Sequence, residues 1–209
     1  AEIREIASLK AGDTIFFIAD KEKQAALYAG QLRNELGQRL DLLEKNAYRF
    51  CFINDFPMYE YDEEQKKIIF THNPFSMPQG GLEALTTKDP LELLAYQYDI
   101  VCNGVELSSG AVRNHNLDIM VKAFEIAGYT EEDLKEKFGA LYNAFQYGAP
   151  PHAGMAPGVD RMIMLLRNEE NIREVIPFPM NGNAQDVMCG APNEVSEMQL
   201  REVHIKVRK

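Results

Sequence analysis

The chain has 209 residues, of which 45% are hydrophobic, and a formal net charge of −10 at pH 7. This apolar content is enough for a buried core, and no run approaches the roughly 20 consecutive apolar residues of a membrane span. The acidic balance excludes a chain whose main role is to coat nucleic acid, because phosphate binding needs a surplus of lysine and arginine. The first five residues lack the pattern of a secretory signal, so we expect a cytoplasmic protein with no membrane partner.

The three cysteines and four histidines are scattered along the chain. No pair of them has the close spacing that builds a transition-metal site, nor do the cysteines indicate a disulfide framework. Any metal is therefore expected to be a hard ion held by carboxylates.

The first 43 residues predict a strand followed by a helix. Gly12-Asp13 precedes the apolar run Thr14–Ile18, which is typical of a turn into a buried strand. Alanine and leucine then recur at helical spacing from Lys21 to about Leu40. Nothing before this strand completes a sheet, so we expect residues 1–43 to be the end of one domain and residues 44–209 to form part of another.

The middle of the chain predicts several antiparallel strands. Residues 49–55 and 66–71 are expected to be strands joined as a hairpin across the acidic segment 62–65, and an irregular loop is expected over residues 73–81. Asn103-Gly104 is a strong signal for a two-residue type I′ turn between the two apolar strands of residues 96–112.

Paired helices are expected next, over residues 116–127 and from Thr130 to about Tyr147. Further strand-like segments are expected at residues 172–178 and 194–209. The order of strands followed by helices predicts an α+β fold, in which helices flank an antiparallel β-sheet.

The two-residue turn brings two carboxylates together. It pairs Val101 with Glu106, and it places Asp99 and Glu106 on one face as diagonal neighbours, about 7 to 8 Å apart at Cα. This separation suits a magnesium ion whose other ligands are water and phosphate oxygens. The alternative is that Asp99 ends a strand and Glu106 faces water on an open sheet.

An arginine follows these carboxylates on the second strand. Simple alternation places Arg113 on the face opposite to Glu106, and a bulge at Ser108-Ser109-Gly110 would bring it round. It is then either an ion-pair partner of the carboxylates or a bidentate clamp for a substrate carboxylate, and we favour the clamp. His72, at the end of an apolar strand, is a candidate donor for the same ligand, and a hydrogen-bonded histidine at a strand end is the alternative.

Residues 148–161, Gly-Ala-Pro-Pro-His-Ala-Gly-Met-Ala-Pro-Gly-Val-Asp-Arg, run from a loop of small residues into an amphipathic helix. Gly154 and Gly158 allow close approach of a ligand, and the helix start offers unpaired N–H groups and a positive dipole end. Arg161 points roughly away from the predicted buried face, which consists of Val159, Met162, Ile163 and Leu166. The segment predicts a nucleotide site; a surface arginine beside a turn is the alternative.

These segments resemble the C-terminal portion of bacterial-type aspartyl-tRNA synthetases, which are class II aminoacyl-tRNA synthetases. Residues 148–161 resemble the third signature motif of that family, residues 98–113 its ATP and aspartate strands, and residues 71–75 its flipping-loop region. The resemblance implies the C-terminal part of the class II catalytic core in residues 44–209. It also implies the end of an inserted, GAD-like domain in residues 1–43.

The resemblance implies a role for each candidate residue. Arg161 would contact the adenine and γ-phosphate of ATP, with Gly158, Val159 and Asp160 beside it. Glu106 and Asp99 would bind Mg²⁺ on the triphosphate, which makes Glu106 and Arg161 the catalytic residues. His72 and Arg113 would contact L-aspartate. The family activates aspartate to aspartyl-adenylate with release of pyrophosphate and transfers it to tRNA(Asp), as a homodimer.

Two departures from the family pattern matter. The chain has His72-Asn73 where many relatives carry two adjacent histidines. It also lacks counterparts of the oligonucleotide-binding barrel and of the first and second motifs, so the 209 residues alone are expected not to charge tRNA. The alternatives are an enzyme that charges both tRNA(Asp) and tRNA(Asn), and a catalytically silent synthetase-like binding module. An ATP-dependent amidating ligase would need an ammonia or glutamine site, which the sequence does not offer.

Overall fold

The computed structural model describes residues 2–208, so Ala1 and Lys209, the outer ends of the two expected domains, lie outside the described residues. Contacts between residues divide the chain into two units, and the boundary in the sequence lies between Ala47 and Tyr48. The sequence places a domain boundary between residues 43 and 44. The assignment of residues 1–43 to an inserted domain stays a prediction.

The first unit contains two helices, α1 (Glu2–Ile6) and α2 (Glu22–Arg39). The second of these matches the helix predicted from residue 21 to about residue 40. The strand predicted at Thr14–Ile18 is wrong: the segment has no regular structure, and Phe17 is 72% exposed. A strand exists only where a neighbour pairs with its backbone, and no segment within residues 2–208 pairs with this one.

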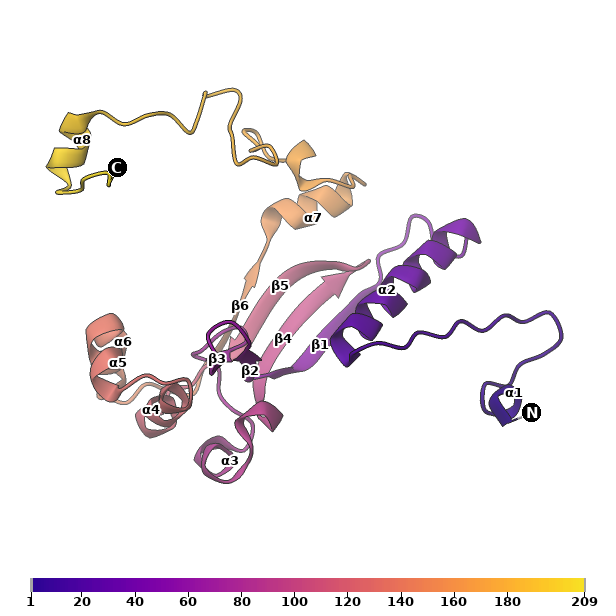
Figure 1. Cartoon of the computed structure of the whole chain (residues 1–209), viewed down its shortest axis with the longest axis horizontal. Coiled ribbons are helices and arrows are strands. Elements are labelled where there is room, and N and C mark those ends of the chain that lie inside the picture. Colours follow the sequence, from indigo (N-terminus) through magenta and orange to yellow (C-terminus); the bar gives the residue numbers. More distant parts are fainter. Residues whose placement is uncertain (1, 209) are drawn as a thin grey trace. The chain divides into compact units, whose positions relative to one another are not determined.

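The second unit is built on a four-stranded antiparallel sheet with the strand order β1-β4-β5-β6. Figure 1 shows these strands side by side, coloured from purple (β1) to orange (β6). Their bounds are β1 (Phe50–Pro57), β4 (Leu94–Cys102), β5 (Val105–Val112) and β6 (Ala153–Pro157). The antiparallel sheet with flanking helices confirms the predicted α+β class.

A separate two-stranded hairpin consists of β2 (Tyr59–Asp62) and β3 (Lys67–Phe70). The acidic turn between residues 62 and 67 is where the sequence predicts it, and Asp62 accepts the backbone N–H groups of Glu64 and Gln65. The predicted pairing is wrong, however, because β1 pairs with β4 in the other sheet and β3 pairs with β2. Pro57, at which β1 ends, separates it from β2.

Helices gather at one end of the sheet (Figure 1). They are α3 (Gly81–Thr87), α4 (Leu117–Ile126), α5 (Glu131–Lys137) and α6 (Gly139–Phe145), with the short 3-10 helix η1 (Pro90–Glu92). Asn116 caps α4 through the N–H groups of Asp118 and Ile119, and Thr130 begins α5 with a capping box that it forms with Asp133. The single helix expected up to about Tyr147 is divided into α5 and α6 at Phe138.

The core of this unit lies between the helices and the β2–β3 hairpin. One buried cluster includes Met58, Tyr59 and Leu93, and a second includes Met120, Phe124 and Leu134. The Tyr59 hydroxyl donates to the carbonyl of Ala123 at 2.8 Å, and burial raises the pKa of this phenol. The hydrogen bond attaches the hairpin to α4. The loop at residues 71–79, which follows the hairpin, therefore begins at a well-packed part of the structure.

The last part of the chain contains α7 (Val159–Leu166), the 3-10 helix η2 (Ile172–Glu174) and α8 (Glu197–Glu202). The strands expected at residues 172–178 and 194–209 are therefore wrong. Ser196 and Gln199 form a capping box that begins α8, a signal that the apolar alternation of this segment concealed. No helix within residues 2–208 has the combination of length and hydrophobicity that a membrane span requires.

Candidate active site

A cavity of about 470 Å³ lies over one face of the sheet and beside the loop that follows β3. Phe56, Gly110 and Ala156 form part of its wall. The polar residues that line it are His72, Asn73, Gln97, Asp99, Glu106, Ser109 and Arg113. Four of the predicted site residues, His72, Asp99, Glu106 and Arg113, thus share one cavity.

The β4–β5 hairpin places the two carboxylates as the sequence predicts. Asn103 and Gly104 both have positive φ, at 50° and 81°, as a type I′ turn requires. Val101 pairs with Glu106, and Asp99 pairs with Ser109, because a bulge at Leu107 adds one residue to β5. The bulge puts Glu106, Ser109 and Arg113 on the face that Asp99 shares, although it lies earlier than the predicted Ser108-Ser109-Gly110 bulge.

The electrostatics of the cavity are set by these two acids. Burial, and then the negative charge of Glu106, raise the pKa of Asp99, while the nearby His72 acts in the opposite direction. A cation between the two carboxylates would relieve the repulsion that Asp99 feels from Glu106. No cluster of three or more histidine, cysteine or acidic side chains in the described part of the chain could hold a metal ion. An ion at Asp99 and Glu106 would therefore take its remaining ligands from a phosphate and water, which is the usual arrangement for Mg²⁺.

Arg113 stands just beyond the end of β5 and is half-buried. Its backbone N–H donates to the carbonyl of His152 at 2.9 Å, and Ser76 forms a β-bridge with it. Within residues 2–208 the Arg113 side chain has neither an ion-pair nor a hydrogen-bond partner. A half-buried guanidinium without partners is costly unless a ligand supplies them. Arg113 is thus available to bind an anion in the cavity.

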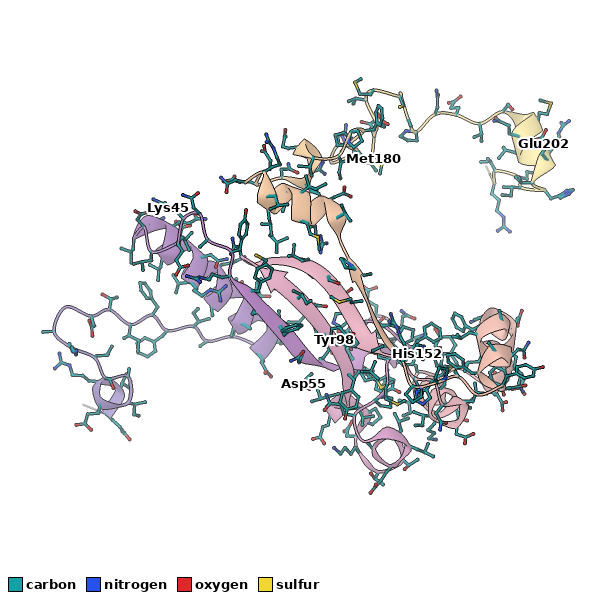
Figure 2. The ribbon with its side chains drawn as sticks, turned by 180° about the vertical axis from the view of Figure 1, so that it is seen from behind. Lys45, Asp55, Tyr98, His152, Met180 and Glu202 are labelled. Carbon is teal, nitrogen blue, oxygen red and sulfur yellow. The ribbon has the colours of Figure 1, made fainter. Side chains whose placement is uncertain are left out.

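Gly110 has a different role from the one its sequence position indicates. A Cβ at this residue would lie 2.3 Å from Cε2 of Tyr98 and 2.6 Å from the carbonyl oxygen of Gly154. The Tyr98 ring crosses Gly110, and its hydroxyl donates to Gly154 at 3.1 Å, which joins three strands (Tyr98 is labelled in Figure 2). Glycine is required at 110 because of this ring, while a Cβ at Gly154 would meet only Nη2 of Arg113 at 3.7 Å.

His72 is exposed at the rim of the cavity, after β3. Its ring makes an edge-on contact with Phe56, with the ring centroids 5.1 Å apart. The contact fixes the imidazole beside the acids and leaves its nitrogens available for a ligand.

Arg161, in the first turn of α7, contacts the site from the side of Glu106. Its Nη1 donates to the Glu106 carbonyl at 2.7 Å and lies 3.4 Å from the Glu106 carboxylate. Arg161 does not line the cavity itself, and its side chain is 45% exposed. Of the third predicted segment, residues 148–161, Ala156 lines the cavity directly, whereas Arg161 contacts the site through Glu106.

The start of α7 differs from the prediction in its buried face. The N–H of Gly158 donates to the carbonyl of Leu107 at 2.7 Å and attaches the loop to β5. The predicted buried face is largely exposed, with Val159 at 63% and Leu166 at 70%, and Met164 is instead the buried residue of this helix. Asp160 is exposed beside Arg161.

Sequence reasoning missed three polar residues of the cavity, Asn73, Gln97 and Ser109. Gln97 lies two residues before Asp99 on the same strand, so the period of two that places Asp99 in the cavity also places Gln97 there. Asn73 belongs to a loop whose course no periodicity predicts. The strand β6, which supplies Ala156, was likewise hidden in a segment that contains three prolines between residues 150 and 157.

The comparison with protein families gives one match over most of the chain. The family described as tRNA synthetases class II (D, K and N) matches residues 7–182.

Curated relatives agree with that match. An aspartate–tRNA(Asp/Asn) ligase of Zymomonas mobilis is 64% identical over 93% of this chain, which corresponds to 33% of the relative. An aspartate–tRNA ligase of Streptomyces avermitilis is 58% identical over the whole chain and 36% of the relative. The chain thus spans about a third of the length of these relatives. Among solved structures, an aspartyl-tRNA synthetase from Entamoeba histolytica is similar over 88% of this chain and 31% of its own, with 22% identity and a TM-score of 0.49.

Proposed function

Because the chain belongs to the class II tRNA synthetases, we propose that its cavity is the amino-acid and ATP site of an aspartate–tRNA ligase. The reaction is the ATP-dependent activation of L-aspartate to aspartyl-adenylate, followed by transfer of the aspartyl group to tRNA. The protein is proposed to act as a homodimer in the cytoplasm.

The observation that carries this proposal is the guanidinium of Arg113. It is half-buried, it lines the cavity, and no partner for it lies within the described range 2–208. Its planar fork matches the two oxygens of a carboxylate, so it would bind the side-chain carboxylate of aspartate. His72, at the rim of the same cavity, adds a donor to this ligand.

The acidic end of the cavity suits the other substrate. Asp99 and Glu106 would hold Mg²⁺ on the triphosphate of ATP. Burial, and then the charge of Glu106, raise the pKa of Asp99, and a cation between the two acids would relieve that repulsion. The ion supplies positive charge that neutralises the triphosphate. Arg161 would turn from Glu106 to the adenine and γ-phosphate, with Gly158, Val159 and Asp160 beside it. Glu106 and Arg161 are in this sense the catalytic pair.

The cavity would promote the reaction chiefly by position and charge. The α-carboxylate of aspartate attacks the α-phosphorus of ATP, the bond to the β-phosphate oxygen breaks, and pyrophosphate leaves. Arg113 orients the amino acid, while Arg161 balances the negative charge that develops on the departing phosphates. A hydroxyl of the terminal ribose of tRNA then attacks the aspartyl carbonyl and releases AMP.

The direct test is aspartate-dependent exchange of labelled pyrophosphate into ATP, measured on the intact protein that carries these residues. We expect exchange with L-aspartate, little with L-asparagine, and loss of exchange when Mg²⁺ is chelated. Binding of aspartate and Mg-ATP without any exchange would instead indicate the silent binding module.

A second candidate concerns the tRNA. The Zymomonas relative is named as a ligase of both tRNA(Asp) and tRNA(Asn), and the Streptomyces relative as an aspartate–tRNA ligase. Several further relatives carry the first name, among them that of Gluconobacter oxydans, which is 61% identical over 97% of this chain and 34% of the relative. This favours an enzyme that charges both tRNAs. Comparison of aspartate attachment to the two purified tRNAs by the intact protein distinguishes the candidates.

A further inference from the structure

Two neutral amides, Asn73 and Gln97, line the same cavity as Arg113. Both are amides among charged groups, since the other polar lining residues include two acids, an arginine and a histidine. Their orientations follow from the hydrogen bonds that each one makes.

The side chain of Asn73 is oriented by its own loop. Its Oδ1 accepts the backbone N–H of Phe75 at 2.9 Å, so the oxygen faces the backbone and the Nδ2 group faces the other way. No hydrogen-bond partner of Nδ2 lies in residues 2–208. Asn73 thus offers N–H donors from a fixed position in the wall of the cavity.

Gln97 fixes that position from the strand. It is only 7% exposed, and its Nε2 donates to the carbonyl of Asn73 at 3.3 Å. The same carbonyl accepts the N–H and the hydroxyl of Ser76, at 3.2 and 2.8 Å, and Ser76 is completely buried. One carbonyl therefore receives three donors, which holds Asn73 between the loop and β4.

The loop is also fastened to both neighbouring strands. Phe75 accepts the N–H of Asn114, Met77 donates to Val112 and accepts from Tyr96, and each of these three bonds is 2.8 to 2.9 Å long. Ser76 forms a β-bridge with Arg113. The backbone of the loop that carries Asn73 is thus held beside Arg113, in the wall of the same cavity.

A bound carboxylate has room for these donors. A carboxylate offers about four lone-pair positions, and a bidentate arginine fills about two of them. The remaining positions need further donors in a site from which water is excluded. Asn73 supplies such donors without adding a charge next to Asp99.

We propose that the side-chain amide of Asn73 donates a hydrogen bond to the aspartate carboxylate that Arg113 binds, and that Gln97 is the positioning residue that holds Asn73 there. The inference rests on the proposed function and names two specificity residues of the same site.

The test is Asn73→Asp in the intact protein, measured by aspartate-dependent pyrophosphate exchange. The substitution keeps an acceptor for the Phe75 N–H, but it replaces the donor by an oxygen that repels the substrate. We expect the KM for aspartate to rise about tenfold or more while the KM for ATP stays within about twofold. Gln79→Glu is the matched control: it makes the same chemical change in the same loop, where Gln79 contacts Asp55 outside the cavity.

Gln97→Met tests the positioning role, because methionine keeps the length of the side chain and removes the donor. We expect a rise of about threefold to fivefold in the KM for aspartate. The double variant with Asn73→Asp should resemble Asn73→Asp alone, since Gln97 acts through Asn73. A purely structural role for Gln97 would instead give additive effects and an equal change in both KM values.

Each outcome decides between these possibilities. An aspartate KM within about twofold of wild type in Asn73→Asp overturns the inference, as does an equal rise in the KM for ATP. Should Asn73→Asp lose its native circular dichroism, Asn73→Ala provides the same comparison without added charge and with a smaller expected rise. A wild-type protein without any aspartate-dependent exchange overturns the proposed function, and this inference with it.

Discussion

The two ends of β5 differ in how their charges are satisfied. At its start, Glu106 is paired with Arg161, and the two side chains are 46% and 45% exposed. At its far end, the half-buried Arg113 is held by its backbone, while its side chain has no partner within the described chain. Under the proposed function, the paired groups at the first end would exchange partners when a ligand binds, whereas Arg113 at the second end would bind a ligand without giving up a side-chain partner.

This difference indicates how the two arginines use ligand-binding energy. Arg113 loses no protein contact when it binds a carboxylate, so its interaction contributes directly to affinity. Arg161 gives up an exposed ion pair, which is worth at most about 1 kcal/mol, before it can bind phosphate. We therefore expect Arg113 to govern the KM for aspartate and Arg161 to act mainly during the reaction.

Replacement of Arg161 gives the largest expected effect. Arg161→Ala removes the charge that would balance the departing phosphates, so kcat/KM for ATP should fall by about 10²- to 10³-fold. Steady-state pyrophosphate exchange at varied ATP measures this loss. Arg167→Ala, at the exposed end of the same helix, is the control and should change the rate little. A large rise in the aspartate KM with normal use of ATP would reverse the roles assigned to the two ends.

Arg113→Lys should have the next largest effect. Lysine keeps the charge but cannot bind two oxygens in parallel, so the KM for aspartate should rise about tenfold to a hundredfold, with the KM for ATP nearly unchanged. The exposed Arg33→Lys on α2 is the control. An unchanged aspartate dependence would leave Arg113 as a structural residue.

Substitutions at two glycines near Arg113 test the packing of the strands there independently of ligand binding. Gly110→Ala pushes a methyl group against the Tyr98 ring and the Gly154 carbonyl, and it should lower the free energy of unfolding by about 2 to 3 kcal/mol, or Tm by roughly 5 to 10 °C. Gly154→Ala, on the neighbouring strand, meets only an ordinary contact at 3.7 Å and should shift Tm far less. Thermal unfolding followed by circular dichroism measures both. Equal losses would mean that Tyr98 does not set the requirement at Gly110.

The predictable part of the site is the part that local rules specify. Asn103-Gly104 requires a type I′ turn, and that turn alone fixes which residue faces Glu106. The extra residue at Leu107 was not predictable at its position, because a bulge depends on how β6 and α7 pack on β5. Loop residues such as Asn73 were missed for a similar reason, since distant backbone hydrogen bonds determine where they lie.

The wrong strand predictions share another cause. Thr14–Ile18 and the strands of the sheet have similar apolar composition, but only the latter have a neighbour to pair with. The segment at residues 194–209 shows the converse, because a local capping box at Ser196 begins a helix despite its alternating pattern. Composition thus predicts the tendency of a segment, while pairing and capping decide its structure.

The smallest expected effect tests the acidic end of the cavity. Burial and the charge of Glu106 raise the pKa of Asp99 in the folded chain. Between the ordinary pKa and the raised one the folded chain binds more protons than the unfolded chain, so the free energy of unfolding falls as pH rises through that window and stays lower at neutral pH. Asp99→Asn removes this penalty, and at pH 7 it should raise Tm by about 1 °C, with the gain vanishing near pH 3, where the carboxyl is protonated in both states.

Thermal unfolding at a series of pH values checks this sign, with the exposed Glu83→Gln on α3 as the control. The same Asp99→Asn variant should bind ATP less tightly in the presence of Mg²⁺, because one carboxylate of the proposed ion site is lost. A variant that is more stable and yet weaker for Mg-ATP would mean that the chain keeps two repelling acids together for the ligand rather than for the fold. A loss of stability at pH 7 would contradict this and would make Asp99 a structural partner of His72. The charges at the acidic end would then stabilise the fold, and that end would no longer differ from the Arg113 end in being kept for a ligand.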